Sequence, residues 1–458
     1  MSDPGKPNIS LDTGFHFHEV DPKSSNAVSA ETRRLLSLHP GLAALVTKTA
    51  ALPPATATLD AQTNVVSEPL GDLTGFVNPV NPTLGLVFSG TGFNTIFRPQ
   101  SPKTPTKLPV PVPGSDNILE LNLTAETLSF AAPLGSVPNR GSGTQGDIFL
   151  NGVPYVQSIS DVTTSPAQGI HFEPGMWLAV PATAVPAEPA TIYTRMASIP
   201  HGVTINAQGI SLGSKAGKPP FATITVNINP FPIGGAQKPS APGTRFFPSQ
   251  TVTNPDTARI PQDLTPFVNA NTITQAMLDN PNVVLANEIA SQDMQSFVTL
   301  IITTDAAGKL PTPPPNPTTP AAPPVTSAPG FGGGTDEIAF LLGDNNAPPQ
   351  KPNANAFKMT AVFWIETVLQ SIVVPPCTAN GLPITIQAAP VPGSSLRPTF
   401  TLTPPKDIAA PITIVVPYIQ IQYSQTVFLN FGPLTWPHVS VATLIPAAPI
   451  VVPASVWP

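Results

Sequence analysis

The chain has 458 residues, of which 41% are hydrophobic and only 10% are charged, and its formal net charge is −6. A disordered chain combines low hydrophobicity with high charge, so this composition predicts a folded protein with a large core. The acidic balance argues against a nucleic-acid-binding face and against a polybasic membrane anchor.

Prolines and glycines set the local pattern, with 63 prolines and 32 glycines along the chain. Because proline lacks the amide hydrogen and fixes φ, this content predicts short strands joined by many turns and loops. The proline-rich surface carries little charge, which favours self-association into a homo-oligomer.

Cys377 is the only cysteine in the chain, which excludes intramolecular disulfides and thiolate zinc sites. The first residues lack a signal-peptide pattern, and no uninterrupted apolar run of ~18 residues occurs. We therefore expect a soluble, cytoplasmic protein without an integral membrane segment.

Residues 1–83 are predicted to be an N-terminal arm with short helices. Ser29 is a typical N-cap for a helical stretch that Pro40 divides, and residues 51–83 form a connection rich in Pro and Thr. His16 and His18, two residues apart in the arm, are a candidate metal pair, although two histidines alone seldom make a closed site.

Residues 84–458 are predicted to form one β domain. In residues 118–125 the pattern alternates clearly, with three leucines on one face and Glu120, Asn122 and Thr124 on the other, which is typical of a half-buried strand. Before residue 230 we expect strands at 84–99, 117–130, 147–160, 169–180, 191–198, 202–208 and 221–229.

Residues 230–357 are predicted to be an irregular insertion. It holds a helical stretch at 271–295, which Pro281 interrupts, and a Pro/Gly-rich segment at 309–334 that ends in a glycine hinge at 332–334. This segment is either a domain boundary or a long surface loop, and we favour the loop because the strands on each side look incomplete alone. From residue 297 on we expect strands at 297–304, 336–342, 358–369, 383–388, 399–402, 412–431 and 438–444.

Many short strands with only two helical segments predict a mainly β fold. We expect a closed or nearly closed antiparallel barrel with long Pro-rich loops, and a β-sandwich is the alternative. No repeat of 20–50 residues occurs, so solenoids and propellers are not expected.

Four segments, in chain order, resemble the nitrobindin-type members of the lipocalin-like barrels. They are the glycine-rich stretch 90–96, the stretch 171–177 (His-Phe-Glu-Pro-Gly-Met-Trp), the hairpin strand 200–209 and the closing hairpin 428–443. The stretches 171–177 and 195–208 also resemble those of larger microbial haem-binding or peroxidase-like proteins.

The resemblance implies a ten-stranded barrel with a hydrophobic interior and a bound haem. One departure matters, because the family's haem-binding histidine follows the closing segment and residues 444–458 contain no histidine. Another histidine would have to replace it, and His171, His201 and His438 are the axial candidates.

His171 is the preferred functional histidine among the candidates. Glu173 and Trp177 share its face of a strand, and a carboxylate two residues away can orient an imidazole. Arg195 lies in an apolar strand and needs an anion, for which Glu173 is the expected partner if the two strands are neighbours. A structural ion pair and satisfied core histidines are the alternatives to a functional site.

Glu366 and Trp364 share one face of another strand, where Glu366 is either a catalytic acid in a pocket or, as we favour, a rim residue. Arg98 and Arg140 are loop candidates for holding an anion. No phosphate loop or nucleophile elbow occurs in the sequence.

These patterns predict a protein that binds a hydrophobic small molecule, with haem as the candidate cofactor, inside a β-barrel. Arg195 would pair with an acid group of the ligand, and peroxidase-like activity would follow from histidine-bound haem. One alternative is a cofactor-free enzyme that acts on an apolar metabolite, with His171, Glu173 and Arg195 as acid–base and anchoring groups. Another is a structural, self-assembling β protein.

Overall fold

A computed structural model describes most of the chain from residue 70 onward. The described residues are 70–81, 84–99, 117–184, 187–199, 202–221, 226–237, 245–305, 332–336, 354–379, 381–431 and 434–458. The chain divides into the units Met1–Val66 and Ser67–Pro458, and every described residue belongs to the second. The predicted arm helices, the pair His16 and His18, and His201 lie outside the described residues.

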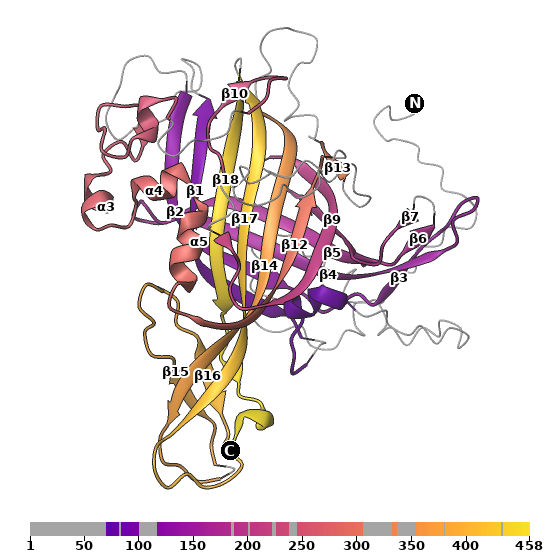
Figure 1. Ribbon diagram of the computed structural model, residues 1–458, viewed down its shortest axis with the longest axis vertical. Helices are drawn as coiled ribbons and strands as arrows, with labels where there is room; N and C mark the ends of the chain where they lie inside the picture. The colour runs from indigo at the N-terminus through magenta and orange to yellow at the C-terminus, as the bar shows by residue number, and fades with distance from the viewer. Residues whose placement is uncertain are drawn as a thin grey trace, which may run out of the picture. The chain divides into compact units, whose positions relative to one another are not determined.

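Ten antiparallel strands form a closed barrel, which confirms the predicted fold class (Figure 1). Each strand pairs with the barrel strands before and after it in the chain, and the last pairs with the first. The strands are β1 (Leu86–Pro99), β2 (Asn117–Phe130), β4 (Ile148–Asp161), β5 (Gln168–Val180), β8 (Ile192–Ser198), β9 (Thr204–Ala216), β12 (Asp293–Thr303), β14 (Asn355–Val374), β17 (Ile412–Phe431) and β18 (Leu434–Pro446).

Shorter elements surround the barrel. The short strands are β3 (Ser136–Asn139), β6 (Thr183–Ala184), β7 (Ala187–Glu188), β10 (Phe231–Pro232), β11 (Arg259–Ile260), β13 (Gly332–Asp336), β15 (Ile384–Gln387), β16 (Thr399–Leu402) and β19 (Ile450–Val451). The helices are η2 (Gly71–Phe76), η4 (Pro248–Gln250), α3 (Thr265–Asn269), α4 (Gln275–Asp279), α5 (Asn282–Ile289) and η5 (Ala454–Val456). In the described part of the chain, no helix has the length and apolar character needed to cross a membrane.

The barrel closes where β1 meets β18, and Figure 1 shows this seam as an indigo-to-purple strand beside a yellow one. Two glycines of β1 allow the close approach. A Cβ atom on Gly90 would lie 2.0 Å from the carbonyl oxygen of Thr443, and one on Gly92 would lie 2.4 Å from that of Val441. Only glycine fits where two backbones come this close.

Two apolar cores lie on opposite faces of the barrel wall. One core fills the lumen, draws on all ten strands and is completed by Leu73 and Phe76 of η2. The other lies on the outer face of β1, β2, β12, β14, β17 and β18 and is completed by the helical segment α3–α5. The outer core makes this sector of the wall buried on both sides.

Most of the predicted elements are present, with a few corrections. The strand predicted at 221–229 is wrong for its described residues, because Val226 and Ile228 pack into the outer core without strand pairing, and the backbone nitrogen of Val226 bonds to Asn280. The glycine hinge predicted at 332–334 is also wrong, because these residues belong to β13, which pairs with β9. Helices η2 and α3 were not expected from the sequence.

The helical stretch at 271–295 is confirmed as α4 and α5, with Pro281 at the junction. β12 lies inside the range predicted as an irregular insertion, and it pairs with β14 on the other side of 309–334. The strands before and after that segment therefore share one sheet.

Candidate ligand site in the barrel lumen

The predicted site residues of β5 and β8 line the lumen. In the register, Trp177 lies opposite Arg195, and Glu173 lies opposite Gln157 of β4. Since alternate residues of a strand face opposite sides, His171, Glu173 and Trp177 share the lumen face of β5. Glu173 and Arg195 are fully buried, with 0% and 1% of their surfaces exposed.

Arg195 is the centre of a polar cluster that we call the lumen network, made of Tyr155, His171, Glu173, Arg195 and Gln425. The Nη2 atom of Arg195 lies 2.5 Å from Oε1 of Glu173, and its Nε donates to the Tyr155 hydroxyl at 2.8 Å. Its Nη1 donates to Oε1 of Gln425 on β17 at 2.6 Å, so the network crosses the lumen. The pairing of Arg195 with Glu173 that the sequence predicts is confirmed.

His171 lies at the more accessible edge of this network. Its Nε2 atom is 3.1 Å from Oε2 of Glu173, while Oε1 of the same carboxylate accepts from the Tyr155 hydroxyl. The His171 side chain is 20% exposed, whereas that of Glu173 is 0% exposed. The carboxylate therefore holds both the imidazole and the guanidinium, as expected for an orienting group.

Aromatic rings enclose the Arg195 guanidinium. Its Cζ atom lies 5.2 Å from the ring centre of Phe363, 5.6 Å from that of Tyr155 and 6.0 Å from that of Trp177. Faces of aromatic rings attract cations, so these contacts offset part of the loss of hydration.

Glu126 of β2 forms a second buried cluster beside the network. Its Oε2 accepts from the Tyr423 hydroxyl at 2.6 Å, and its Oε1 accepts from the Thr124 hydroxyl at 2.8 Å. The amide nitrogen of Gln157 lies 3.1 Å from the Tyr423 hydroxyl and 3.4 Å from Glu126 Oε2. Tyr423 comes from β17 and Glu126 from β2, so this cluster also crosses the lumen.

The two lumen carboxylates have pKa values displaced in opposite directions. Burial opposes ionisation of Glu173, yet Arg195 and His171 lower its pKa from 4.5 to about 2. Burial raises the pKa of Glu126, and hydrogen bonds from Tyr423, Thr124 and Gln157 oppose that rise only in part. One carboxyl is thus held ionised, and its neighbour is more readily protonated.

Polar residues continue from Glu126 to the rim along the lumen face of β2. Asn122 donates to Oε1 of Glu120 at 3.0 Å, and Arg98 of β1 donates to Oε2 of the same carboxylate at 3.0 Å. We call Glu120, Asn122, Thr124 and Glu126 the β2 polar row. The Arg98 side chain is 44% exposed, so this end of the row meets solvent.

The half-buried strand predicted around residue 121 needs a correction. The two faces are those the sequence predicts, but the face with Glu120, Asn122 and Thr124 is buried in the lumen. The opposite leucine face is also buried, because Leu119 and Leu121 belong to the outer core.

The other predicted site residues are spread over the molecule. The register places His438 opposite Val427 on the β17–β18 hairpin, and Arg140 pairs with Asp147 at 2.6 Å on the surface. The rim position favoured for Glu366 is wrong, because this residue is 0% exposed on the outer face and accepts from Gln420 at 2.7 Å.

Sequence reasoning missed several members of the lumen clusters. They are Glu126, Tyr155, Gln157, Tyr423 and Gln425. For Glu126 the signal was present, because it continues the alternation of Glu120, Asn122 and Thr124. For the others no local pattern shows which strand ends up opposite in the lumen.

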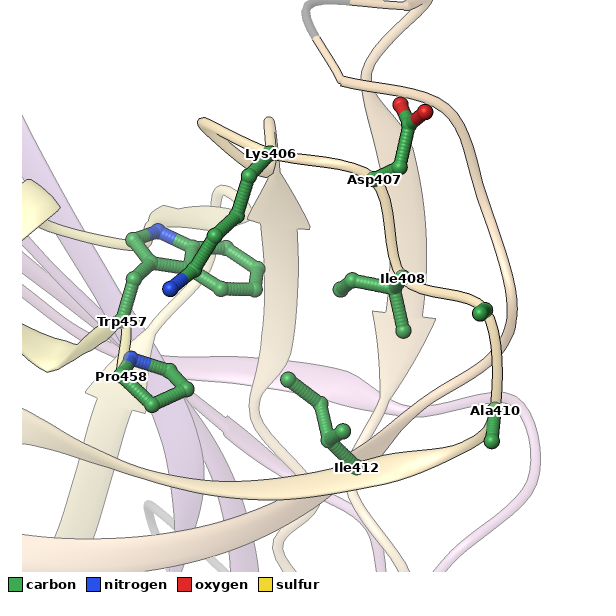
Figure 2. Close-up of a pocket in the computed structure, with 8 residues that line it drawn as sticks. Lys406, Asp407, Ile408, Ala410, Ile412, Trp457 and Pro458 are labelled. Carbon is green, nitrogen blue, oxygen red and sulfur yellow. The ribbon is translucent and has the colours of Figure 1, made fainter.

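Two cavities lie away from the lumen. One, of about 230 Å³, is formed by residues 406–410, Ile412 and the last two residues, and Figure 2 shows Trp457 and Pro458 on one side and Ile408 and Ile412 on the other. The second, of about 180 Å³, lies beside Arg259. Across the described ranges, no group of three or more His, Cys, Asp or Glu side chains could hold a metal ion.

The fold and these clusters define a class, a closed ten-stranded antiparallel barrel whose lumen holds buried charged clusters beside an apolar core. No protein-family model matches the chain, no curated protein matches it, and no solved structure matches it. The nitrobindin resemblance therefore stays a prediction, although the ten-stranded barrel that it implies is present.

Proposed function

We propose that the protein binds a small molecule in the lumen of its barrel, against His171 and the lumen network. The observation that carries this proposal is the concentration of buried charge in the lumen. Glu173, Arg195 and Glu126 are each at most 3% exposed, and their hydrogen bonds join β2, β4, β5, β8 and β17.

Stability alone does not explain such a cluster. Replacing a buried ion pair by apolar residues of similar volume is often neutral or stabilising. Charged groups with displaced pKa values, gathered in one interior, are more typical of a binding or catalytic site. The lumen also carries its charge at the edge that His171 exposes, where a ligand can reach it.

Acid–base chemistry on the bound ligand is a second candidate function. It is favoured by the opposite pKa displacements of Glu173 and Glu126 around His171. Two titratable groups whose pKa values are pushed apart are suited to separate proton-donating and proton-accepting roles. This candidate corresponds to the cofactor-free enzyme among the alternatives that the sequence leaves open.

Haem stays an untested prediction, and the described residues suit a smaller ligand better. The Nε2 atom of His171 contacts Glu173. The apolar part of the lumen is filled by rings such as Trp177 and Phe363, whose centres are 5.0 Å apart. A porphyrin would require these side chains to move.

Native mass spectrometry of the full chain, purified gently, tests the proposal. We expect a retained mass that is lost on denaturation, and a small-molecule library should yield compounds that raise the melting temperature. His171→Phe should weaken that binding by ~10-fold or more, as expected for one lost hydrogen bond to a charged group.

Arg140 provides the matched control, because it is a surface residue that directly follows the end of β3. Arg140→Phe should leave ligand binding unchanged. Absence of any retained mass and of any stabilising compound would contradict the proposal. Equal loss of binding in both variants would contradict the assignment of His171.

A further inference from the structure

We infer that the lumen ligand carries a primary ammonium group, which the side-chain oxygens of Asn94 and Asn122 accept. This inference rests on the proposed function and names the chemical class of its ligand. Asn94 and Asn122 are 3% and 0% exposed, and the Oδ1 atom of each has no hydrogen-bond partner among the described residues.

The two asparagines are adjacent. Asn94 of β1 and Asn122 of β2 lie directly opposite each other in the register. Directly opposed residues of an antiparallel pair have Cβ atoms ~5 Å apart, so one donor group can reach both oxygens. Buried acceptors are nearly always hydrogen-bonded, because an unpaired one has lost its bonds to water without replacement, so two adjacent unpaired acceptors are an unusual feature of a folded interior.

The pair is continuous with the rest of the lumen. Ser440 of β18 lies opposite Asn94 on one side and opposite Gln425 on the other. Gln425 is the residue that accepts from Arg195. A ligand held by the asparagines therefore lies along a polar path that leads from the Arg98 rim to the lumen network.

Several side-chain donors near the pair are already bonded to carboxylates. The amide nitrogen of Asn122 is already used by Glu120, and the Thr124 hydroxyl is used by Glu126. Arg98 and Arg195 are paired with Glu120 and Glu173. Glu126 makes no ion pair with a described Lys or Arg, so carboxylates outnumber guanidinium groups along this path.

These features favour a cation over the other ligand classes. An anion would face unpaired oxygens and an excess of carboxylates, and a purely apolar group would leave both acceptors unsatisfied. An ammonium has three donors and no acceptor, so it can satisfy both Oδ1 atoms and still face the β2 polar row.

Three small probes that each contain three carbon atoms test the inference: n-propylammonium, n-propanol and propionate, each titrated into the full chain and followed by calorimetry and by NMR of the side-chain amides. We expect n-propylammonium to bind at least ~10-fold more tightly than n-propanol, with propionate weaker still. The amide signals of Asn94 and Asn122 should shift with the ammonium probe.

Variants at Asn94 give changes of opposite sign. Asn94→Leu should weaken binding of n-propylammonium by ~10-fold or more, and Asn94→Asp should strengthen it. Thr95→Val is the matched control, because Thr95 is the next residue of the same strand, 1% exposed, and points to the other face. It should leave the affinity unchanged, and the contrast between Leu and Asp does not depend on either variant being as stable as the parent.

The outcomes separate the inference from the proposed function. If a propionate or n-propanol signal maps to the lumen without preference for the ammonium, the ligand class is wrong while lumen binding stands. If no probe and no library compound perturbs the lumen, the two oxygens hold ordered water only and both proposals are overturned. Tighter ammonium binding that Asn94→Leu does not weaken would overturn the assignment to Asn94.

Discussion

Single residues in the lumen show how a buried charge is kept. Arg195 is 1% exposed, and its guanidinium makes three hydrogen bonds and contacts three aromatic rings. Its partner Glu173 is bonded by three side chains in turn. Each charge therefore depends on the other, and removing one leaves the second buried without compensation.

Replacing Arg195 tests this dependence. Arg195→Met should lower the free energy of unfolding by ~3–5 kcal/mol, because Glu173 is left as an unpaired buried carboxylate. Adding Glu173→Gln to this variant should recover part of the loss, as measured by urea unfolding followed by tryptophan fluorescence. Arg140→Met, which breaks a surface pair, is the control and should change little. Additive effects of the two lumen changes would contradict the coupling.

For single residues, the sequence predicts the ion pair of Arg195 and Glu173 but not the side chains that surround this pair. The apolar setting of Arg195 and the two-residue spacing of His171 and Glu173 are local patterns, and both contacts are present. The donors from Gln425 and Tyr155 depend on which strands face each other across the lumen. That arrangement is set by closure of the barrel, which no local spacing encodes.

Among the elements, β2 shows that alternation identifies two faces without saying which one meets solvent. Its leucines point outward under the helical segment, and its polar residues point into the lumen. A strand with one apolar face is usually half-exposed. Here both faces are buried, because the α3–α5 segment covers the barrel from outside and the closed barrel encloses the polar residues of β2 within.

The outer core contains one carboxyl group that makes no ion pair with a described residue. Glu366 of β14 is 0% exposed, its Oε2 accepts from Gln420, and its Oε1 has no partner among the described residues. Burial raises its pKa from 4.5 to about 8. The other ionisable groups near this part of the outer core are Tyr418, whose pKa is raised by burial and by Glu366, and Glu288.

This carboxyl predicts a dependence of stability on pH. The unfolded chain releases the Glu366 proton near pH 4.5, and the folded protein retains it to about pH 8. Its contribution to stability is therefore full below pH 4.5 and is lost as the pH rises to about 8. Glu366→Gln should raise the melting temperature, and by more at pH 8 than at pH 5. A difference that stays constant between these pH values would contradict the prediction.

The seam between β1 and β18 predicts a strong effect of a single methyl group. Gly92→Ala would place its Cβ atom 2.4 Å from the carbonyl oxygen of Val441. We expect a loss of ~1–3 kcal/mol or more in the free energy of unfolding, because the backbone of one strand must shift. Gly146→Ala is the control, since nothing lies within 4 Å of that position. Equal stability of the two variants in guanidinium unfolding would contradict the predicted effect of Gly92→Ala.

For the molecule as a whole, the connectivity is a simple meander that closes on itself. Each barrel strand lies beside the barrel strand that precedes it in the chain, and the pairing of β1 with β18 closes the ring. The order of the strands around the ring therefore follows from their order in the chain, whereas the number ten is implied only by the nitrobindin resemblance. The lengths of β14 and β17, 20 residues each, follow from their continuation beyond the barrel toward the small sheet of β15, β16 and β19.

Closure makes the barrel depend on its last two strands. A chain shortened to end at residue 411 lacks β17 and β18, and it leaves the edges of β1 and β14 unpaired. Open edges with apolar faces favour aggregation, so we expect this chain to lack the native tertiary signal in near-ultraviolet circular dichroism. Sedimentation should show aggregates. A monomer with the native spectrum would contradict the prediction.

The seam has a consequence for engineering the chain. Phe88 and Pro446 face each other across it, and the backbone nitrogen of Ala447 donates to the carbonyl of Val87 at 2.8 Å. A short peptide could therefore join residues near 446 to residues near 86, and new termini could be opened in the connection between β12 and β14. Such a circular permutant would keep every strand pairing of the barrel. It would change only the order in which the ribosome makes the strands.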